Sequence, residues 1–321
     1  MAVYTKVTFA EAEDFLKNYN IGSLTGLEGI TQGVENTNYF LDTDQGRFVL
    51  TIFEKRVNEE DLPYFLGFSE HLSNKNIACP KALYNKNGQN ISTLGGKKAV
   101  IITFLEGKSH MKPSLEACHS AGKFFANLHI AQEGFKPTRK NEMFLEGWKD
   151  LFAKISDKTD RVHPDLYHLI QDEITYLESH LPTNLPTGHI HADLFTDNVF
   201  FKGEEVSGVI DFYFSCTDIL VYDLAICLNA WCFNQEGEFI KDRAEVMLSA
   251  YQSVRPLSSD EHAALNIFLR ASGLRFLLTR SHDWIFHDEN AQVKAKDPME
   301  YYNILTFHQN HNIFDMVKEV S

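Results

Sequence analysis

Hydrophobic and polar positions have a strand-like spacing in the first part of the chain and a helical spacing in the rest. The first part opens with a short helix, because Thr8-x-x-Glu11 has the pattern of a capping box. Segments rich in β-branched and aromatic residues follow, with one helical segment among them. The expected strands are 24–32, 36–43, 47–54, 90–94 and 98–104, and the expected helix is 59–74. This series predicts a small antiparallel sheet accompanied by a helix.

The rest of the chain, from Ser114 onward, has mainly helical spacing. The expected helices are 114–130, 164–180, 218–232, 240–253, 260–286 and 297–308. A second capping box, Ser258-x-x-Glu261, precedes the longest of them. Only two short strands, at 199–201 and 206–210, interrupt the helices. The sequence therefore predicts an α+β protein with a small β-rich lobe at 1–104 and a larger helical lobe at 105–321.

Composition and charge narrow the class of protein. Of 321 residues, 44% are hydrophobic and 23% charged, as in ordinary folded proteins. The 30 basic and 44 acidic side chains give a net charge of −14, which argues against a nucleic-acid partner because phosphate backbones attract basic surfaces. No apolar run approaches a membrane span, the first residues lack a signal-peptide pattern, and the five cysteines form no C-x-x-C pair. We expect a soluble, cytoplasmic protein.

One charged loop carries the residue types that phosphoryl transfer needs. Residues 191–198 have the spacing H-x-D-x-x-x-x-N, and Asp211 follows an apolar strand 13 residues later. In the protein-kinase template, one carboxylate orients the attacking hydroxyl, and an amide and a second carboxylate bind the metal. By this template Asp193 is the catalytic base, while Asn198 and Asp211 hold Mg²⁺ on the phosphates of ATP. We expect His191 to shape the loop through backbone hydrogen bonds.

Other interpretations of this loop stay open. Asp and Asn side chains often cap turns, which is the interpretation that we prefer for Asp197. A His-x-Asp pair also suggests a metallophosphoesterase, although that class needs further clusters of His and Asp ligands. Outside the enzymes, the alternative is a nucleotide-binding pseudokinase that serves as a partner-binding module.

The nucleotide-binding loop is marked less sharply. Gly33 lies between the first two expected strands, and Asn36 and Asn38 open the second, in the region where a kinase places a flexible loop over the phosphates. They do not form the pattern G-x-G-x-x-G, so the glycine alone would indicate only a hairpin turn. We nevertheless expect these three residues to contact the nucleotide.

The cation that contacts the phosphates is also uncertain from sequence. Thr51 occupies the place in the third strand where kinases have a phosphate-binding Lys, so Lys55 becomes the candidate. Only this threonine favours the pseudokinase alternative. A connector at 104–107 follows the sheet, and we expect the backbone of Phe104 and Leu105 to bind the adenine edge.

Over nearly its whole length the chain resembles the aminoglycoside phosphotransferase and choline kinase superfamily, and more narrowly the homoserine kinases within it. The pattern at 191–198 is shared by the whole superfamily and does not specify a substrate. The stretches Asp-Phe-Tyr-Phe at 211–214, Asn-Ala-Trp-Cys at 229–232 and Ser-Val-Arg-Pro-Leu at 253–257 look particular to homoserine kinases. The resemblance implies a protein-kinase-like fold of two lobes.

The resemblance also implies roles for single residues. It assigns Asp193 as the catalytic base, Asn198 and Asp211 as the Mg²⁺ ligands, and Asp223 as a structural support of the catalytic loop. Tyr213 stands where many relatives have a further acidic residue, which puts a second metal site in doubt.

The implied reaction is ATP-dependent phosphorylation of the side-chain hydroxyl of L-homoserine, which gives O-phospho-L-homoserine for threonine biosynthesis. Homoserine is a zwitterion, so its site needs a cation and an acidic or carbonyl group. The candidates are Asp218 and three arginines of one expected helix, Arg275 first and then Arg270 and Arg280. The stretches 211–214, 229–232 and 274–276 would line a compact apolar pocket. Another small alcohol, such as an aminoglycoside, choline or a methylthiosugar, remains the alternative substrate. The sequence leaves monomer and homodimer open.

Overall fold

The structure is a computed structural model that describes residues 4–31, 36–54, 58–287 and 294–317. The described residues form two compact units, which adjoin in the sequence between Glu106 and Gly107. The sequence placed the boundary after residue 104. Within the described ranges, no helix is both long and apolar enough to cross a membrane.

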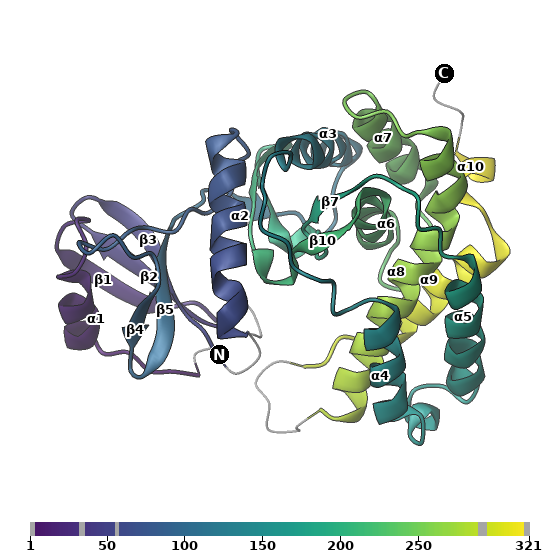
Figure 1. The fold of residues 1–321 in the computed structure, drawn as a ribbon, viewed down its shortest axis with the longest axis horizontal. Coiled ribbons are helices and arrows are strands. Elements are labelled where there is room, and N and C mark those ends of the chain that lie inside the picture. The colour runs from purple at the N-terminus through teal and green to yellow at the C-terminus, as the bar shows by residue number, and fades with distance from the viewer. Residues whose placement is uncertain (1–3, 32–35, 55–57, 288–293, 318–321) are drawn as a thin grey trace. The chain divides into compact units, whose positions relative to one another are not determined.

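The first unit is an antiparallel sheet with helices beside it (Figure 1). The sheet has the order β1-β2-β3-β5-β4, in which every neighbouring pair is antiparallel. Its strands are β1 (Leu24–Gly29), β2 (Thr37–Thr43), β3 (Gly46–Ile52), β4 (Ser92–Leu94) and β5 (Lys97–Thr103), and its helices are α1 (Phe9–Leu16) and α2 (Leu62–Asn74). The capping box at Thr8 starts α1 as the sequence predicted.

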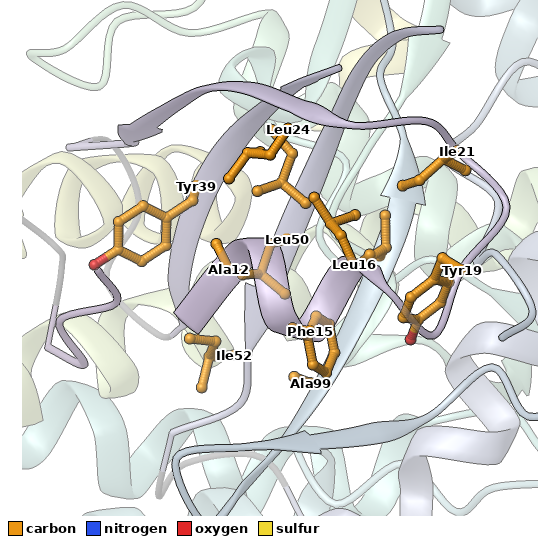
Figure 2. Packing of buried hydrophobic residues seen from close by; sticks show 12 residues of the cluster. Ala12, Phe15, Leu16, Tyr19, Ile21, Leu24, Tyr39, Leu50, Ile52 and Ala99 are labelled. Carbon is orange, nitrogen blue, oxygen red and sulfur yellow. The ribbon is translucent and has the colours of Figure 1, made fainter. Parts of the chain in front are cut away.

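The core of this unit forms where α1 packs on one face of the sheet (Figure 2). Ala12, Phe15 and Leu16 of α1 are buried against Leu50 of β3 and Ile52 at its end. Side chains two apart in a strand share a face, so the apolar residues of β3 reach the helix together. This packing explains the strand-like spacing of the first part of the chain.

The second unit is mainly helical. Its helices are α3 (Leu115–Ala131), α4 (Leu145–Ile155), α5 (Leu166–His180), α6 (Leu220–Trp231), α7 (Lys241–Gln252), α8 (Ser259–Ile285), α9 (Met299–Asn310) and α10 (Ile313–Met316). The buried helix α6 packs on α8, while α3 packs on α7 (Figure 1). The α+β fold that the sequence predicted is confirmed.

Short strands in the second unit carry the charged loop. They are β6 (Lys108–Ser109), β7 (Thr187–Ile190), β8 (Val199–Lys202), β9 (Glu205–Val209) and β10 (Cys216–Ile219). The hairpin of β8 and β9 was expected, but the pair of β7 and β10 was not, and neither was α4. The expected helix 218–232 begins only at Leu220, because residues 216–219 pair with β7 instead. Tertiary pairing therefore decided this boundary.

Candidate active site

The charged loop joins β7 to β8 and passes through a short 3₁₀ turn at Thr196–Asn198. Ala192 has a φ of 63° and Asp211 a φ of 66°, the left-handed region that non-glycine residues seldom adopt. Such conformations persist only where surrounding contacts enforce them, and they gather at functional sites. Asp211 is a residue that the sequence selected for chemistry, and Ala192 directly precedes another, Asp193.

Asp193 and Asn198 are joined directly. The side-chain nitrogen of Asn198 donates to the backbone oxygen of Asp193 at 2.9 Å and to its carboxylate Oδ2 at 3.0 Å. Because the nitrogen of the amide is committed to Asp193, its oxygen remains as the acceptor for a cation. Burial raises the pKa of Asp193 to about 6, against the opposing charge of Arg275. A carboxylate of that pKa suits proton transfer near neutral pH better than an ordinary one.

Asp211 stands at the end of β9 and begins the turn Phe212–Phe214. The backbone nitrogen of Ile210 donates to the backbone oxygen of Asn198 at 3.0 Å, which fixes this strand end next to the loop. Asp211 and Asn198 thus offer carboxylate and amide oxygens, the ligand types that Mg²⁺ prefers. The described residues contain no cluster of three His, Cys, Asp or Glu ligands. A cation that takes most of its ligands from water and phosphate fits the donor set at this site.

Asp223 of α6 supports the loop from the buried side. It is fully buried, and its carboxylate accepts the backbone N–H of His191 at 2.9 Å and that of Ala192 at 2.8 Å. Burial alone would raise the pKa of Asp223, but hydrogen bonds and the nearby His129 outweigh it and lower the pKa. These contacts hold Ala192 in its left-handed conformation.

The His191 ring crosses the loop. Its Nε2 lies 2.9 Å from the backbone oxygen of Ile210, and its Nδ1 accepts the backbone N–H of Asp193 at 3.3 Å. A neutral ring with its hydrogen on Nε2 satisfies both contacts, and burial lowers the pKa of His191 accordingly. The ring therefore links the base to the strand that leads to Asp211.

Arg275 of α8 lies beneath the loop and is 2% exposed. Its Nη1 donates to the backbone oxygen of Ala192 at 2.7 Å, and its guanidinium covers the ring of Phe276. No hydrogen-bond partner for its buried Nε occurs among the described residues. A contact between Arg275 and a substrate carboxylate stays a prediction. Arg270 and Arg280 of the same helix are instead in ion pairs with Glu173 and Glu300.

The stretch 229–232 is buried within the second unit. The indole nitrogen of Trp231 donates to the backbone oxygen of Leu194 at 2.9 Å, and the amide nitrogen of Asn229 donates to that of Leu269. We expected this stretch to line a pocket, but its side chains support the catalytic loop and α8. The sequence singled out the stretch 229–232 but not the contact of Trp231 with the loop, because no short-range pattern connects Trp231 with Leu194.

Asp218, the second substrate candidate, lies in β10. Its Oδ2 accepts the side-chain nitrogen of Asn141 at 2.6 Å, and its Oδ1 accepts the backbone N–H of Ile219 at 2.7 Å. Burial raises the pKa of Asp218 against these hydrogen bonds. The side chain remains partly exposed, so a contact with an ammonium group stays a prediction.

In the first unit, two of the expected nucleotide residues, Gly33 and Lys55, lie outside the described residues. Asn38 of β2 faces Thr51 of β3, and its side-chain oxygen accepts the Thr51 hydroxyl at 2.7 Å. Asn36 is buried, with its side-chain oxygen 3.3 Å from the backbone N–H of Glu54. Thr51, at the position where we expected a kinase lysine, therefore has a partner for its own hydroxyl in Asn38.

Two features near these residues were not expected. Lys97 of β5 forms an ion pair with Glu54, which also accepts the Thr37 hydroxyl at 2.8 Å. Phe104 directly follows β5 and packs edge-on against Phe40, with ring centres 5.9 Å apart. Leu105, like Phe104, is partly exposed. The lysine had no motif around it that would have separated it from other surface lysines.

Comparisons with known proteins place the chain among phosphotransferases. The model of the phosphotransferase enzyme family matches residues 26–257. A homoserine kinase from Paramagnetospirillum magneticum is 49% identical, with 96% of this chain and 97% of that protein aligned. A second, from Methylobacterium radiotolerans, is 48% identical, with 96% of each protein aligned.

Solved structures agree on the fold. An amicoumacin kinase in complex with AMP-PNP and Ca²⁺ superimposes with a TM-score of 0.71 at 13% identity, over 96% of this chain and 95% of that one. At such low identity the likeness concerns the fold alone. The protein-kinase-like fold that the sequence predicted is confirmed.

Proposed function

The chain belongs to the homoserine kinases of the phosphotransferase enzyme family, and we propose that Asp193, Asn198 and Asp211 form its active site. The reaction moves the γ-phosphoryl group of ATP to the side-chain hydroxyl of L-homoserine. The products are ADP and O-phospho-L-homoserine, an intermediate of threonine biosynthesis. The main observation that supports this proposal is the hydrogen bond from Asn198 to the carboxylate of Asp193.

Asp193 acts as the base. The hydroxyl oxygen of homoserine attacks the γ-phosphorus, the bond from that phosphorus to the bridging oxygen of ADP breaks, and the hydroxyl proton passes to Asp193. The amide of Asn198 orients the carboxylate through Oδ2. Positioning of this kind supplies most of the catalysis in phosphoryl transfer, because little covalent chemistry is left to the protein.

A divalent cation accompanies ATP, and we propose Mg²⁺. The amicoumacin kinase, which shares the fold, was solved with an ATP analogue and Ca²⁺. Asn198 and Asp211 would hold the ion in this chain, since both present oxygen atoms at the loop. When bound, the ion neutralises the charge that develops on the phosphates.

The first unit would bind the nucleotide. Phe104 and Leu105 follow β5, and we propose that their backbone groups contact adenine. We also propose that Gly33, Asn36 and Asn38 contact the nucleotide. Lys55 remains the proposed phosphate cation, and Lys97 is held by Glu54. The second unit would then hold homoserine, through Arg275 for its carboxylate and Asp218 for its ammonium group. We also propose that the enzyme works in the cytoplasm.

An assay of ADP release tests the substrate. Wild-type protein is compared on homoserine, serine, threonine, choline and kanamycin at equal concentrations. Serine lacks one methylene, so a site that fixes its carboxylate and ammonium groups holds its hydroxyl out of line with the γ-phosphate. A misplacement of about 1 Å can cost on the order of 10²-fold, so we expect kcat/KM for serine to be lower by about that factor. Equal kcat/KM for serine and homoserine, or a preference for kanamycin or choline, would contradict the proposal.

A further inference from the structure

A buried series of hydrogen bonds connects the catalytic loop to the segment between α7 and α8. We infer that Tyr251 and Arg255 are positioning residues for phosphoryl transfer, which act on the loop through His129 and Asp223. We refer to Asp223, His129, Tyr251, Arg255 and Glu261 as the Asp223 network. Arg255 belongs to the stretch 253–257, to which the proposed function gives no role.

The contacts of the network are short and continuous. His129 Nε2 lies 3.1 Å from Asp223 Oδ2, and His129 Nδ1 lies 2.7 Å from the Tyr251 hydroxyl. Arg255 then donates to that hydroxyl at 3.1 Å and to Glu261 at 2.7 Å. Glu261 is the third residue of α8 and completes its capping box, because its other oxygen accepts the backbone N–H of Ser258, the N-cap residue. One series of hydrogen bonds therefore joins α3, α6, α7 and α8 and ends at the Asp223 carboxylate.

All hydrogen bonds of the network have one consistent direction. Arg255 has only donors, so the Tyr251 oxygen accepts from it and the Tyr251 hydrogen points to His129 Nδ1. An ionised Asp223 has only acceptors, so the hydrogen of a neutral His129 lies on Nε2. In this arrangement alone, each polar hydrogen that His129, Tyr251 and Arg255 direct into these contacts has an acceptor. It leaves Asp223 to accept from His129 and from the loop at once.

The network acts on the strained part of the loop. Asp223 binds the backbone N–H groups of His191 and Ala192, and Ala192 has the left-handed conformation that needs outside restraint. Asp193 follows directly, so the direction of its carboxylate depends on that restraint. Loss of the Tyr251 hydroxyl leaves His129 free to rotate away from Asp223, and the loop then loses a fixed acceptor. The expected loss is in the rate of the chemical step rather than in substrate binding.

The inference rests on the proposed function, since its main readout is kcat for homoserine. Tyr251→Phe keeps the ring and removes the hydroxyl, and Arg255→Met removes the donor to it. We expect kcat to fall about tenfold in each, below the roughly 10²-fold cost of a 1 Å misplacement, with both KM values within about twofold. The double variant should be no slower than the slower single variant, because both break one network.

Matched controls separate positioning from stability. The Arg270–Glu173 pair has the same 2.7 Å length as Arg255–Glu261, and the exposed fractions of its side chains are 13% and 1% against 14% and 2%. Tyr19 makes a buried hydroxyl contact with Ser92 in the first unit. Arg270→Met and Tyr19→Phe should lower the melting temperature while kcat stays within about twofold. A kcat within twofold of wild type for Tyr251→Phe, or an equal loss in Arg270→Met, overturns the inference.

A second measurement needs no substrate. Hydrogen exchange of a peptide that spans residues 190–195 should be faster in Tyr251→Phe than in wild type and unchanged in Tyr19→Phe. Unchanged exchange in Tyr251→Phe also overturns the inference. If the wild type fails to phosphorylate homoserine, the proposed function fails, whereas the exchange result still decides whether the network restrains the loop.

Discussion

Two groups of polar residues meet at the catalytic loop and differ in how they use their hydrogen bonds. Asp223, His191 and Trp231 are buried, and they bind backbone groups of residues 191–194 or the strand end beside them. Asp193, Asn198 and Asp211 are partly exposed, and they carry the oxygens that the reaction needs. The first group supports the loop, and the second is the group to which we assign the chemistry.

From this difference we expect substitutions in the two groups to have different effects on stability and on activity. The supports satisfy buried backbone groups, so their loss exposes unpaired atoms and costs both stability and rate. The chemical group includes a carboxylate whose pKa burial raises to about 6, which means that its charged form is disfavoured in the folded protein. Substitution in this group should abolish activity without unfolding the protein.

The largest expected effect is that of Asp193→Asn. We expect kcat to fall by about 10² or more, since the variant has no base. The folded carboxyl group has a raised pKa, so its stability contribution is lost as pH rises from about 4 to about 6. The metal-free variant should therefore be more stable than wild type at pH 8, by on the order of 1 kcal/mol, and not at pH 4. Urea denaturation in EDTA at both pH values measures this, and a kcat near that of wild type would exclude Asp193 as the base.

Asp211→Ala should follow in size. Binding of ATP in the presence of Mg²⁺ should weaken about tenfold or more, while binding of ATP without metal stays nearly unchanged, because the lost ligand acts through the ion. Titration calorimetry with and without Mg²⁺ gives both values, and Tyr213→Phe is a neighbouring control. Equal losses under the two conditions would make Asp211 a structural residue.

Arg275→Ala tests a residue that contacts the loop and that we also propose as a substrate contact. Loss of the donor to Ala192 should lower kcat about tenfold, and loss of the Nε donor should raise KM for homoserine several-fold. The KM for ATP should stay unchanged. Arg280→Ala, on the same helix but paired with Glu300, is the control. An unchanged kcat would refute the support of the loop, whereas an unchanged KM for homoserine would remove only the substrate contact.

The smallest expected effect concerns His308, which contacts Asn229 and does not touch the catalytic loop itself. We call these two residues the outer layer of the supports. His308 is buried with its Nε2 2.8 Å from the side-chain oxygen of Asn229, and burial lowers its pKa to about 3. The unfolded chain binds a proton there below about 6.5, so stability is lost as pH falls from 6.5 toward 3. Between pH 7 and pH 5 this loss is about 2 kcal/mol in wild type and should be absent in His308→Gln.

Thermal and urea denaturation of both proteins at the two pH values measure the difference, and kcat at pH 7.5 is the control. If the two proteins lose the same stability on acidification, His308 is not the group responsible. If kcat falls as well, the outer layer is coupled to the catalytic loop more tightly than the contacts of Asn229 indicate.

The fold was predictable where local patterns agree with burial. Thr8 and Ser258 start α1 and α8 through capping boxes, and both are confirmed because such caps need only neighbouring residues. The pair of β7 and β10 was missed, since Cys216 finds its partner in Ile190, and no short-range signal connects them. The start of α6 was therefore placed two residues too early.

The sequence by itself determined the chemical group of the site. Asp193 and Asn198 are five residues apart, so one loop holds both within hydrogen-bond distance. Tertiary structure alone decided the supports, because Asp223 reaches Ala192 from 31 residues away and His129 from 94. Residues so distant in sequence meet only when helices pack. No sequence motif spans such distances, so none could have predicted these contacts. A short motif can therefore specify which functional side chains are present, while their orientation depends on the packing of the whole core of the second unit.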